Sequence, residues 1–176
     1  MDWWTQRPSN SYRAARTSGR PSVTELCPRL LIGDYPRLED IEWLRREFAI
    51  TAVQNLQDDE DLRIHDLHEA TLAQAYDAHG IRFVRTPIQD GSADAMAARL
   101  EAALDDLARL ARPGERVYMH CNAGLNRAPT LAIAYLRAFC NMSLNEALAH
   151  VKERRACGPF MTVLEDYFGP RDQRPS

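Results

Sequence analysis

The stretch RVYMHCNAGLNRAPTLAIAYLRAF, residues 116–139, decides the fold, because three structural signals follow one another in it. RVYM is a short apolar run of the kind that forms a buried strand. APTLAIAYLRAF has the apolar spacing of an amphipathic helix. The loop HCNAGLNR between them therefore ends where a helix exposes unpaired backbone N–H groups, and such groups bind anions.

Working outward from this stretch, short apolar or β-branched runs that end in turn residues predict further strands. The four predicted strands are residues 29–33, 50–56, 81–87 and 116–121. Segments with helical periodicity alternate with them, and only helices follow the fourth strand. The predicted helices are residues 38–48, 64–79, 93–111, 126–140, 144–155 and 162–168. This alternation predicts an α/β fold, with a small central, mostly parallel sheet flanked by helices on both faces.

The chain length of 176 residues fits one domain, which we expect to span residues 25–170. Residues 1–24 are rich in Arg and Ser and predict a flexible N-terminal arm, which contains Trp3, Trp4 and Tyr12. Residues 171–176 are expected to form a tail.

Cys121 is the candidate nucleophile, because a thiolate can attack phosphorus and the dipoles of the loop and helix favour the thiolate form. Arg127 lies six positions later and can return over the loop as a bidentate clamp on phosphate oxygens. The small residues Ala123 and Gly124 allow the backbone to curl around one anion. The predicted phosphate-binding residues are Asn122, Ala123, Gly124, Leu125, Asn126 and Arg127. His120 is expected to support the loop by hydrogen bonds rather than to transfer a proton.

The leaving oxygen needs a proton, and Asp90 in the turn-rich segment TPIQDGS is the candidate acid. Asp94 is a weaker rival, because it is expected to begin the next helix. The charged run from Asp58 to Asp61 is interpreted as a polar loop. No residue set resembles a metal site, so we expect neither a metal nor a cofactor.

Composition excludes other classes of function. The formal net charge of -3 gives no polybasic surface, so no nucleic-acid partner is expected. No apolar run reaches the length of a membrane span, so no membrane association is expected either. The four cysteines lack the density of a secreted disulfide scaffold. We therefore expect a cytoplasmic protein, and one that is a monomer.

The chain resembles the dual-specificity branch of the protein tyrosine phosphatases, and within it the plant glucan phosphatases of the like-starch-excess type. The resemblance covers about residues 28–160, including LIGDYPRLEDIEWL, NLQDDEDL, TPIQD and HCNAGLNRAP. Its most discriminating point is Ala128–Pro129, since most dual-specificity phosphatases carry Ser or Thr where this chain has Ala128. The CNAG start of the loop is also similar to that of laforin. The resemblance implies the cysteine-dependent phosphatase fold and a phosphorylated α-glucan substrate.

Three hypotheses remain open at this point. The first is a glucan phosphatase, although Ile64 and His65 stand where the plant enzymes have aromatic residues and Gly91 follows the acid. The second is a phosphatase for phosphotyrosine, phosphoserine and phosphothreonine in proteins, or for another small phosphate ester. The third is an inactive phosphate-binding module, which the combination of Cys121, Arg127 and Asp90 argues against.

Overall fold

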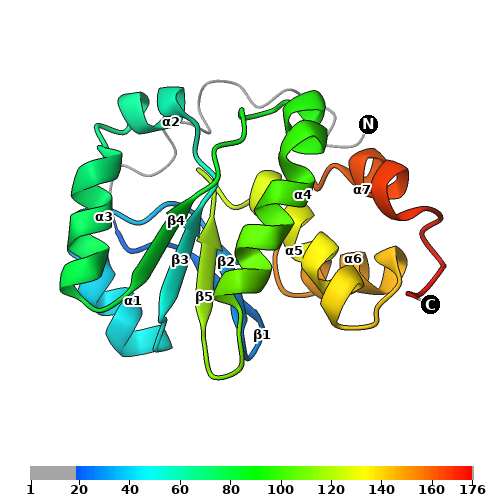
Figure 1. Ribbon diagram of the computed structural model, residues 1–176, viewed down its shortest axis with the longest axis horizontal. Helices are drawn as coiled ribbons and strands as arrows, with labels where there is room; N and C mark the ends of the chain where they lie inside the picture. The colour runs from blue at the N-terminus through cyan, green and yellow to red at the C-terminus, as the bar shows by residue number, and fades with distance from the viewer. Residues whose placement is uncertain (1–18, 176) are drawn as a thin grey trace.

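The computed structural model describes residues 19–175, and Figure 1 shows a central sheet with helices on both sides. Within these residues, five strands form the sheet in the order β1-β2-β5-β3-β4. Their bounds are β1 Val23–Cys27, β2 Leu30–Gly33, β3 Ala52–Asn55, β4 Arg82–Arg85 and β5 Val117–His120. β1 pairs antiparallel with β2, and every other neighbouring pair is parallel. The predicted α/β fold with a mostly parallel sheet is confirmed.

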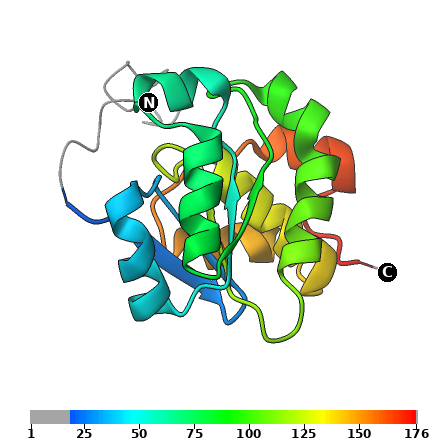
Figure 2. The same cartoon turned by 60° about the vertical axis from the view of Figure 1, so that its left-hand side comes forward.

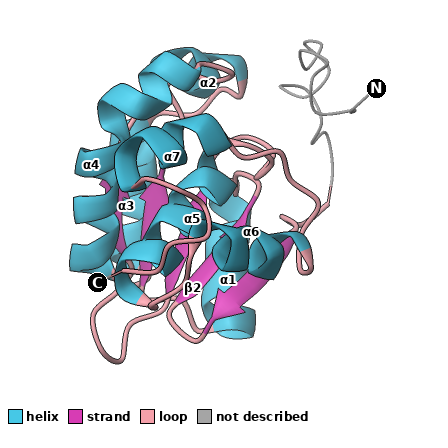
Figure 3. Ribbon diagram, turned by 90° about the vertical axis from the view of Figure 1, so that its right-hand side faces the viewer, coloured by secondary structure: helices cyan, strands magenta, loops and turns pink. Residues whose placement is uncertain are grey.

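The helices form two layers because successive strand residues point to opposite faces of the sheet. Their bounds are α1 Ile41–Phe48, α2 Asp59–Ile64, α3 Glu69–Ala78, α4 Ala93–Leu110, α5 Arg127–Phe139, α6 Leu144–Lys152 and α7 Met161–Phe168. Leu31, Val53 and Tyr118 share one core cluster with residues of α1 and α3. Ile32 and Met119 belong to the other cluster, with residues of α4 to α7. Figure 2 separates these two layers, and Figure 3 views the molecule from the side of α6 and α7. None of the helices within residues 19–175 is long and apolar enough to span a membrane.

The four strands predicted from sequence are present with slightly shorter bounds, but β1 was missed. β1 begins at Val23, inside the segment predicted as a flexible arm. It lies at the edge of the sheet, and only Leu26 of its five residues is fully buried, so it lacks the apolar signature of the inner strands. Residues 1–18 of the predicted arm, with Trp3, Trp4 and Tyr12, lie outside the described residues.

The interpretation of the acidic run as a polar loop is wrong. Asp58 is the N-cap of α2, and Asp61 lies inside this helix with no exposed surface. The predicted helix over residues 64–79 is instead two helices, since α2 ends at Ile64 and α3 begins at Glu69. Asp66 between them has a left-handed φ of 53°, which a continuous helix cannot contain.

Most of the segment predicted as a tail, residues 171–176, is attached to the domain. The carbonyl of Arg171 accepts a hydrogen bond from the Asn145 N–H at 2.9 Å, and its guanidinium pairs with Glu165 at 2.8 Å. Arg174 pairs with Glu146 of α6. These contacts join residues up to Arg174 to α6 and α7.

Candidate active site

The candidate site lies where parallel strands end, the edge at which loops of an α/β sheet converge. Cys121 follows β5 directly and is 3% exposed, so its thiol is recessed. Residues 122–126 form the loop that leads into α5. Within residues 19–175, no backbone N–H of residues 122–126 donates a hydrogen bond to another protein group. This loop, which we call the phosphate loop, therefore offers a row of unused donors at a helix N-terminus.

Gly124 is required at its place in the phosphate loop for two reasons. Its φ is +64°, and a Cβ there would lie 2.6 Å from the carbonyl of Gly33. Arg155 holds the outer side of the loop, because its Nε donates to the Gly124 carbonyl at 2.8 Å and its Nη2 to the Ala123 carbonyl at 3.0 Å. In a trans peptide the N–H points away from the C=O, so these bonds direct the N–H groups of Gly124 and Leu125 away from Arg155.

Arg127 is fully buried, and among the described residues only Nη1 of its guanidinium donates hydrogen bonds to the protein. Nη1 donates to Asp61 Oδ2 at 2.7 Å and to the Ile88 carbonyl at 2.8 Å. Nε and Nη2 make no hydrogen bond within the described part of the chain, although Nη2 lies 3.1 Å from Asp90 Oδ1. Burial alone would lower the pKa of Arg127, but the negative charges of Cys121, Asp90 and Asp61 raise it above its usual value. The side chain is therefore a buried cation whose Nε has no partner among the described residues and whose Nη2 faces only the Asp90 carboxylate. This Nε–Nη2 edge is the one that can grip phosphate in a bidentate manner.

Asp61 is the site residue that the sequence analysis missed. Besides Arg127, its Oδ1 accepts from Asn122 Nδ2 at 2.6 Å, and its Oδ2 accepts from the Asp58 N–H at 3.0 Å. Burial raises the pKa of this carboxyl, but the Arg127 charge and these hydrogen bonds outweigh that effect and leave it below its usual value. The spacing of Asp58 and Asp61 fits a helix capping box, which was the available signal for α2. No sequence signal pointed to the contact with Arg127.

The structure brings Asp90 to the other side of Arg127. Asp90 lies in the turn between β4 and α4, and its side chain is 23% exposed. Its backbone N–H donates to Asp58 Oδ2 at 3.2 Å. Asp94, the rival candidate, lies exposed in the first turn of α4. Asp90 is thus partly accessible to solvent and close to the arginine, as a proton donor to a bound ester must be.

The remaining predicted residues have neighbours that fix the loop. His120 is buried, and its Nδ1 donates to the carbonyl of Cys121 at 3.1 Å. Asn122 is held between Gln57 and Asp61. Asn126 Nδ2 donates to the Gly158 carbonyl at 2.7 Å, which ties the end of the loop to the segment after α6. Leu125 is tied to the same segment, because its carbonyl accepts from the Gly158 N–H at 2.8 Å.

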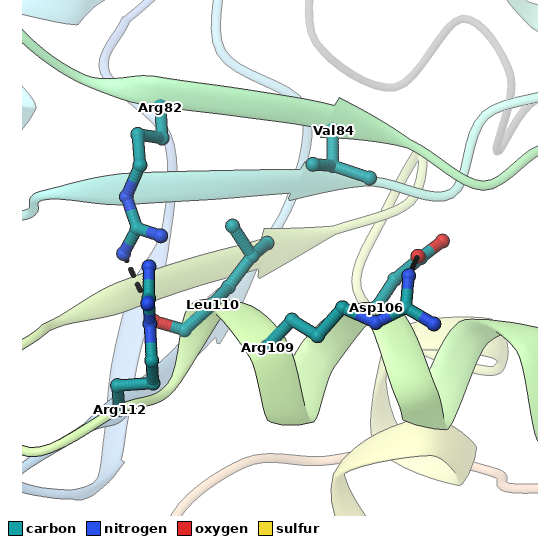
Figure 4. A pocket seen from close by; sticks show the side chains of 6 residues that line it. All are labelled: Arg82, Val84, Asp106, Arg109, Leu110 and Arg112. Carbon is teal, nitrogen blue, oxygen red and sulfur yellow. Dashed lines mark hydrogen bonds and ion pairs between the residues drawn. The ribbon is translucent and has the colours of Figure 1, made fainter.

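A separate cavity of about 320 Å³ lies between β4 and α4, and Figure 4 shows its lining. Three of the six side chains that line it are arginines, but two of them are bound to neighbours. Arg82 donates to the Leu110 carbonyl and pairs with Glu115, while Arg109 pairs with Asp106. None of the predicted site residues lines this cavity. Among residues 19–175, no group of three or more His, Cys, Asp or Glu could hold a metal ion.

This site combines the recessed thiol of Cys121, the N–H groups of the phosphate loop and the partly unpaired guanidinium of Arg127. Such a combination is typical of proteins that bind a phosphate-sized anion beside a cysteine. The sequence model described as "Dual specificity phosphatase, catalytic domain" matches residues 31–164. The chain therefore belongs to the dual specificity phosphatase family, and the predicted membership of this branch is confirmed.

Relatives with assigned names agree with this family. The chain is 34% identical to the Bos taurus protein "Dual specificity protein phosphatase 26" over 136 residues, which cover 77% of the chain and 60% of the relative. It is 27% identical to the Homo sapiens protein "Dual specificity protein phosphatase 5" over 146 residues, covering 83% of the chain and 34% of the relative. The chain thus matches less than two thirds of the length of these relatives. They are named as protein phosphatases, and the predicted closeness to plant glucan phosphatases is not shown.

Solved structures support the fold. The solved structure of Tk-PTP in the active form superimposes with a TM-score of 0.70 at 25% identity, covering 83% of this chain and 95% of that one. PTPMT1 in complex with PI(5)P superimposes with a TM-score of 0.69 at 20% identity, covering 81% of this chain and 90% of that one. At 20% identity, the likeness to PTPMT1 shows a shared fold and nothing more.

Proposed function

We propose that this chain is a cysteine-dependent phosphatase that hydrolyses phosphate monoesters through a phosphocysteine intermediate. The observation that carries the proposal is Arg127, a fully buried cation whose Nε and Nη2 make no hydrogen bond within the described residues. A charged donor without a hydrogen-bond acceptor is costly to bury unless an anion binds to it, and the ion pair with Asp90 reaches only Nη2. The negative charge of Cys121 is one of the causes that hold the pKa of Arg127 above its usual value, against the lowering effect of burial.

In the first step, Sγ of Cys121 forms a bond to phosphorus while the bond to the ester oxygen breaks. Asp90 gives its proton to that leaving oxygen, and the phosphate loop N–H groups and Arg127 bind the three remaining oxygens. In the second step, water attacks the phosphocysteine, and the Asp90 carboxylate takes a proton from it. The S–P bond breaks, inorganic phosphate leaves and the Cys121 thiolate is restored.

The main substrate class that we propose is phosphoprotein. The named relatives are dual specificity protein phosphatases, which supports this class. An aromatic pair beside the phosphate loop supports it as well. Tyr35 stacks on His65 with ring centroids 4.1 Å apart, and the Tyr35 N–H donates to the Asn122 carbonyl at 3.0 Å. Tyr35 is only 4% exposed, so the partly exposed ring of His65 is the part of this pair that is available to the ring of a phosphotyrosine.

Phosphorylated α-glucan is the second candidate, and the sequence around Ala128 favours it. The partly exposed ring of His65 is available to a sugar ring as well, and it lies in the region where the plant enzymes carry aromatic residues. Ile64, its neighbour, is 39% exposed and adds apolar surface. Phosphate release from a phosphopeptide panel and from phosphorylated amylopectin, measured side by side at equal enzyme concentration, separates the two substrates.

Cys121→Ser tests the chemistry itself. A serine hydroxyl is a far weaker nucleophile than a thiolate, so we expect hydrolysis of an aryl phosphate to fall by about 10⁴-fold or more while vanadate still binds. Hydrolysis near the wild-type rate in Cys121→Ser would refute the covalent mechanism. Wild-type protein that binds vanadate without hydrolysing any ester would support the inactive binding module instead.

We also propose a reducing, cytoplasmic setting and a monomeric state. All four cysteines are free, as a thiol nucleophile requires. Fluorescence microscopy of a tagged chain tests the location, and light scattering of the purified chain tests the monomer.

A further inference from the structure

We propose that the capping box of α2 positions both the acid and the arginine of the site, with Asp58 acting on Asp90 and Asp61 acting on Arg127. This inference rests on the proposed phosphatase function. A capping box normally satisfies the free N–H groups at a helix start. Here each of its two carboxylates also binds a second group, and both of these groups belong to the site.

Asp58 uses one carboxylate oxygen for the helix and the other for the acid. Oδ1 accepts from the Asp61 N–H at 2.8 Å, and Oδ2 accepts from the Asp90 N–H at 3.2 Å. Asp90 lies in a turn and is followed by Gly91, whose φ is +68°. A turn next to a glycine has little intrinsic stiffness, so an anchor at the Asp90 N–H fixes the point from which the acid side chain emerges.

Asp61 uses its carboxylate in a parallel way. Oδ2 accepts from the Asp58 N–H at 3.0 Å, closing the box, and also from Arg127 Nη1 at 2.7 Å. The contacts then close into a ring, because Arg127 Nη2 lies 3.1 Å from Asp90 Oδ1. Moving any one member therefore shifts the acid relative to the clamp. A displacement of about 1 Å between catalytic groups can cost about 10²-fold in rate.

A purely structural role for Asp58, stabilising α2, is the competing explanation. Asp58→Asn separates the two, because asparagine is as good an N-cap as aspartate. Its amide oxygen can accept from the Asp61 N–H, but its NH₂ group cannot accept from the Asp90 N–H. Asp58→Ser is a second variant, since its single hydroxyl also caps the helix and offers no second oxygen. Glu60→Gln is the matched control, because it removes one negative charge from the first turn of the same helix.

The test compares an aryl phosphate, whose leaving group needs no proton, with an alkyl phosphate, whose leaving group does. We expect Asp58→Asn and Asp58→Ser to lose about tenfold more kcat on the alkyl phosphate than on the aryl phosphate. Their thermal midpoints should stay close to that of the wild type. Glu60→Gln should retain the wild-type ratio of the two rates. Equal losses on both substrates would overturn the assignment of Asp58 as a positioning residue.

A double mutant provides the second readout. If Asp58 acts through Asp90, Asp58→Asn should have no further effect on alkyl phosphate hydrolysis in the Asp90→Asn background. Additive losses there would show that Asp58 acts only on stability or on another group, and would refute the inference. Failure of the proposed function looks different, because the wild type would then show no Cys121-dependent hydrolysis of the aryl phosphate at all.

Discussion

Replacing Asp61 by Asn should lower both the stability of the fold and the activity of the site. The substitution keeps the size of the side chain but removes the charge that lies 2.7 Å from Arg127 Nη1. Both side chains are essentially unexposed, at 0% and 1%. Breaking a buried ion pair by removing one partner costs about 3–5 kcal/mol. Because asparagine keeps one acceptor, we expect the lower end, about 3 kcal/mol of unfolding free energy, or a thermal midpoint about 9 °C lower.

Activity should fall with both aryl and alkyl phosphates, because Arg127 binds the phosphate whatever the leaving group. A shift of the guanidinium by about 1 Å predicts a loss of about 10²-fold in kcat. The assays are denaturant unfolding at neutral pH and steady-state kinetics with the two esters. Asp59→Asn is the matched control, since the Asp59 side chain is 94% exposed and its pair with Arg85 should contribute no more than about 1 kcal/mol.

The pH dependence of stability gives an independent check. The pKa of Asp61 is lower in the folded chain than its usual value of 3.8, so its ionised form stabilises the fold above about pH 4. That contribution is lost as the pH falls through the folded pKa. The difference in stability between the wild type and Asp61→Asn should therefore be constant from about pH 5 to 7 and shrink below about pH 4. A difference under about 1 kcal/mol at neutral pH, or full activity of Asp61→Asn, would refute the reasoning.

Three further predictions concern single residues. Asp90→Asn should slow alkyl phosphate hydrolysis about 10²-fold or more and aryl phosphate hydrolysis much less; equal slowing in steady-state assays would assign the acid elsewhere. Gly124→Ala should reduce both thermal stability and vanadate affinity, because its φ is +64° and the added Cβ would meet Gly33; a variant with wild-type affinity in titrations would contradict this. Ala128 has no hydroxyl to offer the Cys121 thiolate, and the side chains of Thr130 and Asn126 are bonded to other groups. We therefore expect rapid-quench kinetics to show a burst that shrinks in Ala128→Ser, and a wild type without a burst would show that the hydroxyl is not needed.

The inner part of the fold could be predicted because its signals are local. β2, β3, β4 and β5 were recognised from short apolar or β-branched runs that end in turn residues. β1 is an edge strand with one fully buried residue, so its sequence carries little of this pattern. α2 was missed because four consecutive acidic residues suggest a solvent-exposed loop. Asp61 is instead buried, and its charge is paired with Arg127, 66 positions further along the chain.

In the candidate site, too, the residues of one loop could be predicted from the sequence, and the contacts between distant segments could not. Cys121, Arg127 and the residues between them lie in one continuous loop between a strand and a helix, so their types and spacing predict their chemistry. Asp90 could be proposed because it follows a predicted strand in a turn. The contact of Asp61 with Arg127 depends on how β3 and β5 pair, and the anchoring of Asp90 by Asp58 depends on how two loops meet. Such contacts between distant segments have no local pattern from which to read them.

The position of β5 has a consequence for the order of assembly during synthesis. β1 and β2 form one pair and β3 and β4 another, and within the described sheet only β5 joins the two pairs. The sheet therefore cannot close until residues 117–120 have left the ribosome, and until then β2 and β3 keep edges that invite mispairing. Because Cys121 follows β5 directly, its thiol takes its place only as the nascent sheet becomes continuous.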